Sequence, residues 1–94
     1  MPDEPRLERA RTLFALLADQ QRLKILLALK AGSELCVGEL ARVLGVSVSV
    51  TSHHLRKLRD LGILEDRSEG KLAYYSLREG LVADLALAAL ACCR

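Results

Sequence analysis

The sequence predicts a small domain that is mainly α-helical and carries one β-hairpin. The chain has 94 residues, which is the usual length of a single domain. We therefore expect one domain over residues 1–94. Leu and Ala supply a third of these residues and only three are aromatic, a composition that favours helices. Residues 63–67 and 72–77 have the pattern of two short strands, and Gly70 lies in the turn between them.

The first part of the chain predicts two helices. Apolar residues recur at helical spacing from Leu7 to Leu17, with charged residues on the opposite face. Asp19 is suited to cap a second helix over residues 20–31, and Gly32 is expected to end it. The second helix has little polar surface, so we expect it at the centre of the domain.

The middle of the chain predicts two helices joined by a tight turn. One helix covers about residues 37–44 and the next about residues 48–61. Gly45 can adopt the left-handed conformation that the turn requires, and Ser47 can cap the second helix. Residues 37–61 therefore have the pattern of a helix-turn-helix, a motif that places its second helix in the DNA major groove.

The second helix of this motif has an apolar face and a polar face. Short hydroxyl side chains on the polar face let a helix backbone approach DNA, and His and Arg can donate to base edges or phosphates. We therefore expect DNA contacts from Ser47, Ser49, Ser52, His53 and Arg56.

The hairpin over residues 63–77 has the position of a wing, a two-stranded ribbon that follows the helix-turn-helix. It carries Arg67 and Lys71 near its tip, where cations suit phosphate or minor-groove contacts. Basic residues on both elements make the DNA-binding interpretation more specific than the helical pattern alone, although the net charge is only +2.

A last helix is predicted over residues 79–92. Apolar residues surround almost its whole circumference, and Asp84 is its only internal charge. A monomer can cover one face of such a helix but not all of it. We therefore expect a homodimer that forms through the first and last helices.

Three segments resemble the ArsR/SmtB family, and the SmtB branch in particular. They are residues 33–41 (SELCVGELA), 52–56 (SHHLR) and 74–77 (YYSL), and the resemblance covers about residues 7–94. It implies a dimeric winged helix-turn-helix repressor that releases double-stranded DNA when it binds a metal ion. The paired reading helices would then contact a pseudo-palindromic operator with half-sites about one helical turn apart.

The metal sites of that family are partly present. Cys36 matches one site, where the second cysteine of the family's Cys-x-Cys pair is missing. A second site matches Glu79 and Cys92 but has Leu81 at a histidine position. Cys92 and Cys93 also resemble the adjacent cysteines with which some members sense arsenite. The resemblance implies zinc, nickel or arsenite as inducer, held mainly by Cys92 with Cys93 and Glu79, and by Cys36 secondarily.

Other interpretations of these residues stay open. Cys36 can be a small apolar packing residue, and Cys92-Cys93 can simply end an apolar helix. The regulator can respond to thiol oxidation instead of an ion. The same fold can also dock to a protein partner without any ligand response, although its basic surface favours DNA.

Several classes of protein are not expected. The sequence has no glycine-rich phosphate loop and no recognisable nucleophile with a base, so we expect neither an enzyme nor a small organic substrate. The longest stretch almost free of charge, residues 81–93, is about half the length of a membrane span. The acidic N-terminus resembles no signal peptide, and three cysteines make a poor disulfide framework, so a cytoplasmic protein with free thiols is expected.

Overall fold

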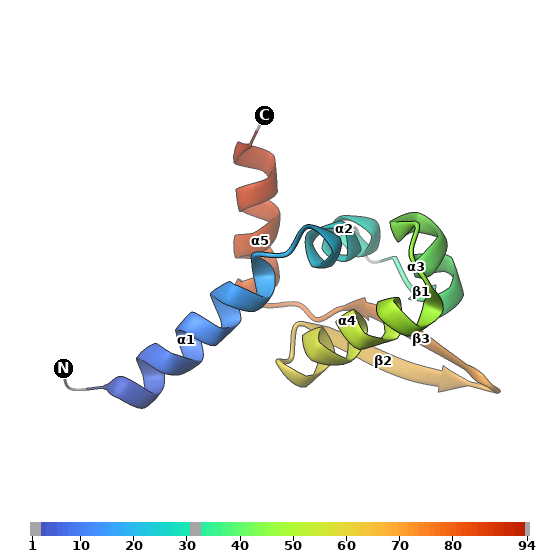
Figure 1. Ribbon diagram of the computed structural model, residues 1–94, viewed down its shortest axis with the longest axis horizontal. Coiled ribbons are helices and arrows are strands. Elements are labelled where there is room, and N and C mark those ends of the chain that lie inside the picture. Colours follow the sequence, from blue (N-terminus) through green and yellow to red (C-terminus); the bar gives the residue numbers. More distant parts are fainter. Residues whose placement is uncertain (1–2, 31–32, 94) are drawn as a thin grey trace.

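The computed structural model describes residues 3–30 and 33–93 (Figure 1). Within them lie five helices and three short strands, which confirms the predicted fold class. In chain order they are α1 (Glu4–Leu17), α2 (Gln20–Leu29), β1 (Leu35–Cys36), α3 (Val37–Leu44), α4 (Val48–Asp60), β2 (Leu64–Glu69), β3 (Leu72–Leu77) and α5 (Leu81–Cys92). The predicted end of the second helix, at Ala31 and Gly32, lies outside the described residues.

Side-chain caps set where the helices begin. Asp3 accepts a hydrogen bond from the Arg6 N–H at 3.2 Å, so α1 begins at Glu4. The sequence prediction started this helix at Leu7 because it followed only the apolar spacing. Asp19 accepts from the N–H groups of Gln21 and Arg22 at the start of α2, as predicted.

The sheet has one strand more than the predicted two-stranded wing. Its antiparallel order is β1-β3-β2, and the added strand β1 places Leu35 opposite Tyr75 and Cys36 opposite Tyr74. Strand β2 also runs further than predicted, to Glu69, and leaves a two-residue turn. Gly70 occupies that turn with φ 62°, a conformation that glycine adopts at little cost.

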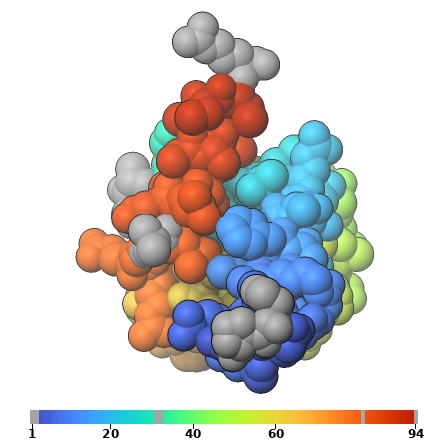
Figure 2. Space-filling model, turned by 90° about the vertical axis from the view of Figure 1, so that its left-hand side faces the viewer, coloured from blue at the N-terminus to red at the C-terminus, as the bar shows by residue number. Residues whose placement is uncertain are grey.

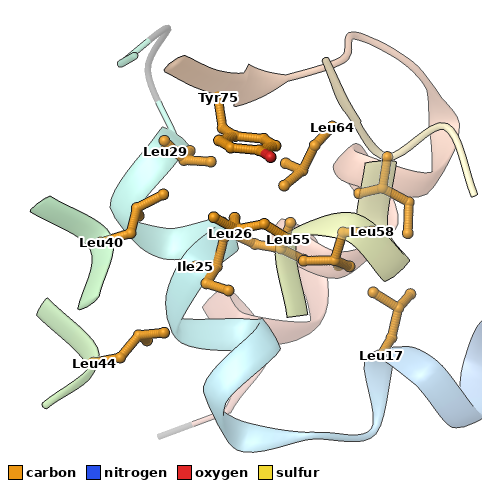
Figure 3. Packing of buried hydrophobic residues seen from close by; sticks show 12 residues of the cluster. Leu17, Ile25, Leu26, Leu29, Leu40, Leu44, Leu55, Leu58, Leu64 and Tyr75 are labelled. Atoms are coloured by element: carbon orange, nitrogen blue, oxygen red, sulfur yellow. The ribbon is translucent and has the colours of Figure 1, made fainter. Parts of the chain in front are cut away.

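Helix α2 lies at the centre of the core, as its apolar composition predicts. Its Ile25, Leu26 and Leu29 are fully buried. They pack against side chains from α3, α4 and the sheet, which Figure 3 shows around Leu26. Because one helix contacts all of these elements, it fixes how the helix-turn-helix sits against the sheet.

Helices α1 and α5 extend from one end of the molecule, and the β2–β3 hairpin extends from the other (Figure 1). The radius of gyration is 13.8 Å. A compact chain of this length has a radius of about 12 Å, so the extensions are substantial. In the described part of the chain, no helix is both long and apolar enough to cross a membrane.

Candidate nucleic-acid interface

The turn between α3 and α4 has the geometry that its sequence predicts. Gly45 ends α3 in the left-handed conformation with φ 70°. The N–H groups of Gly45 and Val46 both donate to the Ala41 carbonyl, at 2.9 and 3.3 Å. Ala41 itself is buried, as expected for a small residue at a helix crossing. These contacts hold α4 at a fixed angle to α3.

Helix α4 buries one face and exposes the other. Thr51, Leu55 and Leu58 are fully buried against the core. A helix turns by about 100° per residue, so Ser49 and His53 lie on the opposite, exposed side. The structure therefore leaves the predicted reading face open to a ligand.

Two serines flank this face in different ways. Ser47 caps α4, since its Oγ accepts from the Val50 N–H at 3.1 Å. Its hydroxyl proton can still be donated to an acceptor such as a phosphate. Ser52 is half-buried and lines an open groove between α4 and the wing.

That groove brings α4 and the hairpin to one surface. It has a volume of about 230 Å³ and is lined by Ser52, Lys71, Gly38 and Tyr75, among others. The predicted contacts Ser52 and Lys71 therefore share one groove although they are far apart in the sequence.

The exposed cations of α4 and the wing include Arg56, Lys57 and Lys71. None of them forms an ion pair with any residue that the structure describes. Lys57 was not among the predicted site residues, although its place beside Arg56 in the last turns of α4 could have suggested it. Free cations of this kind are suited to phosphate contacts.

Apolar side chains are also exposed on α4. Val48 and Val50 are 50% and 45% exposed. A β-branched side chain at this place can contact a thymine methyl group in the major groove.

Arg67 differs from the other predicted contact residues because its guanidinium is occupied. Its Nε donates to both Glu34 carboxylate oxygens, at 2.9 and 2.8 Å, and its Nη1 donates to Glu69 at 2.8 Å. These carboxylates raise the pKa of Arg67, and Arg67 in turn lowers the pKa of Glu34. The side chain also lies over the Tyr74 ring at 5.0 Å.

His54, the neighbour of His53 on α4, is buried. Its Nδ1 accepts a hydrogen bond from the Arg22 Nε at 3.1 Å. Burial is the largest cause that lowers the pKa of His54; Asp19 opposes this shift, and Arg22 and His53 add to it. Arg22 also donates from Nη1 to the Leu16 carbonyl at 3.1 Å and so connects α1, α2 and α4. Arg22 was not among the residues predicted from the sequence.

The cysteines are all free, and they lie in two places. Cys36 is half-buried at the start of α3, where its N–H donates to the Glu39 carboxylate at 3.0 Å. This N–H is the main cause that lowers the pKa of Glu39, with a further contribution from the Cys36 thiol. Cys92 and Cys93 are exposed at the end of α5. The backbone at Cys93 has left the helical conformation and is extended, with φ −85° and ψ 129°.

The described residues do not assemble a metal site within one chain. No three His, Cys, Asp or Glu side chains among them lie close enough together to hold an ion. Glu79 is exposed before the start of α5, whereas Cys92 lies at its end. A helix of this length spans about 18 Å, so these two donors do not meet in one chain. An ion that uses both would need a second copy of the chain.

An apolar groove lies between α1, α2 and α5. It has a volume of about 290 Å³ and is lined by Phe14, Leu17, Leu23 and Leu85, with three alanines. Phe14 and Leu85 are 58% and 47% exposed. Figure 2 shows this face, with α1 in blue beside α5 in orange and red.

Comparison with known proteins identifies the family. Residues 19–66, half of the chain, match the model of the arsR family of bacterial regulatory proteins. The chain belongs to the arsR family. It is thus a member of a family of regulators rather than of enzymes.

Two relatives carry names that mention metals. A cadmium resistance transcriptional regulatory protein, CadC, from Listeria innocua is 42% identical over 72 residues, which are 77% of this arsR-family chain and 60% of the relative. The arsenical resistance operon repressor of Escherichia coli is 46% identical over 65 residues, which are 69% of this chain and 56% of that protein. The chain thus spans less than two thirds of the length of these relatives.

A solved structure has the same fold. It is described as the homodimeric winged helix-turn-helix DNA-binding domain of a possible ArsR-family regulator from Mycobacterium bovis. The two structures have a TM-score of 0.82 at 29% identity, over 96% of this chain and 82% of that one.

The match to the arsR family model covers only part of the candidate site. Residues 19–66 include α2, α3, α4 and the first part of β2. Helices α1 and α5, with most of the residues that line the apolar groove and with Cys92 and Cys93, lie outside it. The family match therefore includes the helix-turn-helix and Cys36, but not Glu79, Cys92 or Cys93.

Proposed function

We propose that this arsR-family chain is a DNA-binding transcriptional regulator that acts as a homodimer. The observation that carries the proposal is the open face of α4. Ser49, His53 and Arg56 are exposed there on a helix that a fixed turn and a buried core hold in place. Hydroxyl, imidazole and guanidinium groups on such a helix can donate to base edges and phosphates.

The wing extends this surface. Lys71 lies at the hairpin turn and lines the same groove as Ser52. A phosphate strand that follows this groove would contact α4 and the wing together, which fixes the register of the reading helix on the duplex.

The second copy of the chain would occupy the apolar groove between α1 and α5. The chain exposes 6390 Å² of surface. A compact monomer of 10.3 kDa exposes about 5,400 Å². The excess is close to the roughly 800 Å² that each partner buries in a standard interface. The Mycobacterium bovis domain with the same fold is described as homodimeric, which supports a dimer but does not specify its interface.

The direct test is a titration of the protein into duplexes from its own promoter region. We expect two chains to bind one pseudo-palindromic site, with half-sites about one helical turn apart. Affinity should fall steeply as salt is raised. Inserting five base pairs between the half-sites should abolish the tight complex. Failure to bind any duplex above the affinity for random DNA would instead favour docking to a protein partner.

We propose further that an ion controls this binding, as the names of the relatives suggest for cadmium and arsenicals. Thiolates are soft donors, and Cys92 and Cys93 provide two of the three in the chain. If the two α5 helices run antiparallel, Cys92 can meet Glu79 of the partner subunit. Such a mixed sulfur and oxygen set suits zinc or nickel, whereas a thiol pair suits arsenite.

This ion response has its own experiment. DNA affinity is measured with zinc, nickel and arsenite in the presence of a reductant, for the wild type and two thiol variants. We expect Cys92→Ser/Cys93→Ser to lose the response and Cys36→Ser to keep it. The opposite result would place the sensor at α3, and a response that both variants retain would exclude the thiols.

A further inference from the structure

Arg67 carries the strongest cluster of side-chain contacts on the surface of the hairpin. We propose that Arg67 is a positioning residue, which fastens the wing to the strand before α3, and that Lys71 makes the wing's DNA contact. This inference rests on the proposed function, because it assigns different tasks to two cations of the same DNA-binding surface.

The contacts of Arg67 cross the whole sheet. Arg67 on β2 lies opposite Tyr74 on β3, and Tyr74 lies opposite Cys36 on β1. From β2 the guanidinium passes over the Tyr74 ring and reaches Glu34, which directly precedes β1. We call the group formed by Glu34, Arg67, Glu69 and Tyr74 the sheet clamp.

The geometry of the sheet clamp leaves Arg67 little capacity for another anion. The Nε and Nη2 atoms donate to Glu34 as a bidentate pair, at 2.8 and 2.7 Å, and Nη1 donates to Glu69. A DNA phosphate would have to displace a carboxylate and approach a second one. Like charges repel at such distances, so the clamp disfavours a phosphate contact at Arg67.

Lys71, unlike Arg67, has no carboxylate partner among the residues that the structure describes. It lies in the turn beyond the clamp and is exposed. A mobile ammonium group at the tip of a hairpin can follow a phosphate without losing an internal partner.

The clamp also has a structural task that its location explains. Strand β1 has only two residues, so few backbone hydrogen bonds attach it to β3. Cys36, the second of these residues, is also the N-cap of α3. An ion pair from β2 to Glu34 therefore links the wing to the start of the helix-turn-helix and sets their relative orientation.

Three variants test this assignment: Glu34→Gln, Arg67→Gln and Lys71→Gln. Each replaces a charge by an amide, and the operator affinity of each is measured over a range of salt concentrations. We expect Glu34→Gln and Arg67→Gln each to lower affinity by about two- to fivefold without changing the salt slope. The double variant Glu34→Gln/Arg67→Gln should bind the operator no more weakly than Arg67→Gln alone, because both changes remove the same contact. Lys71→Gln should reduce the slope of log affinity against log salt by about 1.

A direct phosphate contact by Arg67 gives a different pattern. Glu34→Gln would then release the guanidinium and raise affinity, and Arg67→Gln would reduce the salt slope as Lys71→Gln does. Either outcome, or an unchanged affinity for Glu34→Gln, overturns the proposal. Thermal unfolding of each variant shows whether the fold has been retained.

A readout without DNA separates this proposal from the proposed function. If the wild type binds no duplex, the regulator proposal fails, but the clamp can still be measured by amide hydrogen exchange. Glu34→Gln should accelerate exchange in β1 and β3, whereas Lys71→Gln should leave it unchanged. Equal exchange in the two variants would overturn the clamp itself.

Discussion

Two regions of this chain differ in how completely one copy folds them. The reading unit, from α2 to β3, has capped helices, left-handed glycines at its turns and a fully buried core. The helix pair α1 and α5 buries little, since the residues of α5 that are buried, among those whose side chains the structure describes, are the small Ala83 and Ala86. Phe14 and Leu85 of this pair remain exposed. If the proposed function holds, the contrast teaches that one chain suffices to fold the reading unit, whereas the helix pair would be completed by a second copy.

The largest expected effect is on the stability of the reading unit. Leu55 is fully buried, so Leu55→Ala leaves a cavity and should lower the free energy of unfolding by about 2–5 kcal/mol. Val43, which is 55% exposed on α3, supplies a control. Val43→Ala should change the free energy by less than about 0.5 kcal/mol. Urea denaturation at fixed chain concentration measures the free energy of unfolding of both variants. Equal losses would contradict the view that the core of the reading unit stabilises the fold.

Substitutions in the helix pair should change the formation of the dimer and leave the folding of the chain intact. Leu85→Asp places a charge in the apolar groove, so we expect a folded monomer by sedimentation and an operator affinity at least about a hundredfold weaker. Val43→Asp, at a similarly exposed position outside the groove, should remain dimeric. A Leu85→Asp protein that stays dimeric would place the interface elsewhere.

A smaller effect distinguishes residues within the reading face. Arg56→Gln should weaken operator binding and reduce its salt slope by about 1, because it removes one phosphate contact. Ser52→Ala and His53→Gln should change the preference among operator sequences and leave that slope unchanged. Arg9→Gln, on the exposed side of α1, is the matched control. Wild-type binding by all three reading-face variants would show that α4 does not face DNA.

The smallest expected effect is a pH dependence of stability. The pKa of His54 lies below its ordinary value of 6.5 in the folded chain, mainly because of burial. The unfolded chain therefore binds more protons between the folded pKa and about 6.5, and the free energy of unfolding should fall as pH drops through this range. His54→Gln, which keeps an acceptor for Arg22, should remove the dependence. His53→Gln at the exposed neighbour should keep the pH dependence. A loss in both variants would show that His54 alone does not cause it.

The features that the sequence predicted well are those with local causes. The left-handed turn needs only Gly45, and the cap of α4 needs only Ser47 and the N–H three residues later. The exposed face of α4 follows from helical spacing. In each case the residues that form the feature are neighbours in the chain, so the pattern itself contains the interaction.

The features that were missed depend on partners far apart in the sequence. Strand β1 has two residues and exists because β3 pairs with it, so it has no periodicity of its own. Arg67 was predicted to contact DNA, and its ion pair with Glu34, 33 residues away, was not predicted. The contact of Arg22 with His54 spans 32 residues. Such pairs are defined by the packing of helices and strands and cannot be found from spacing along the chain.

The apolar groove between α1 and α5 has a consequence for how much protein a cell must make. For a regulator whose two reading units are joined only through this groove, the amount of competent dimer at low abundance rises with the square of the chain concentration. Halving synthesis would then lower operator occupancy about fourfold in that regime. The control of its target genes would thus change more steeply than in proportion to gene dosage.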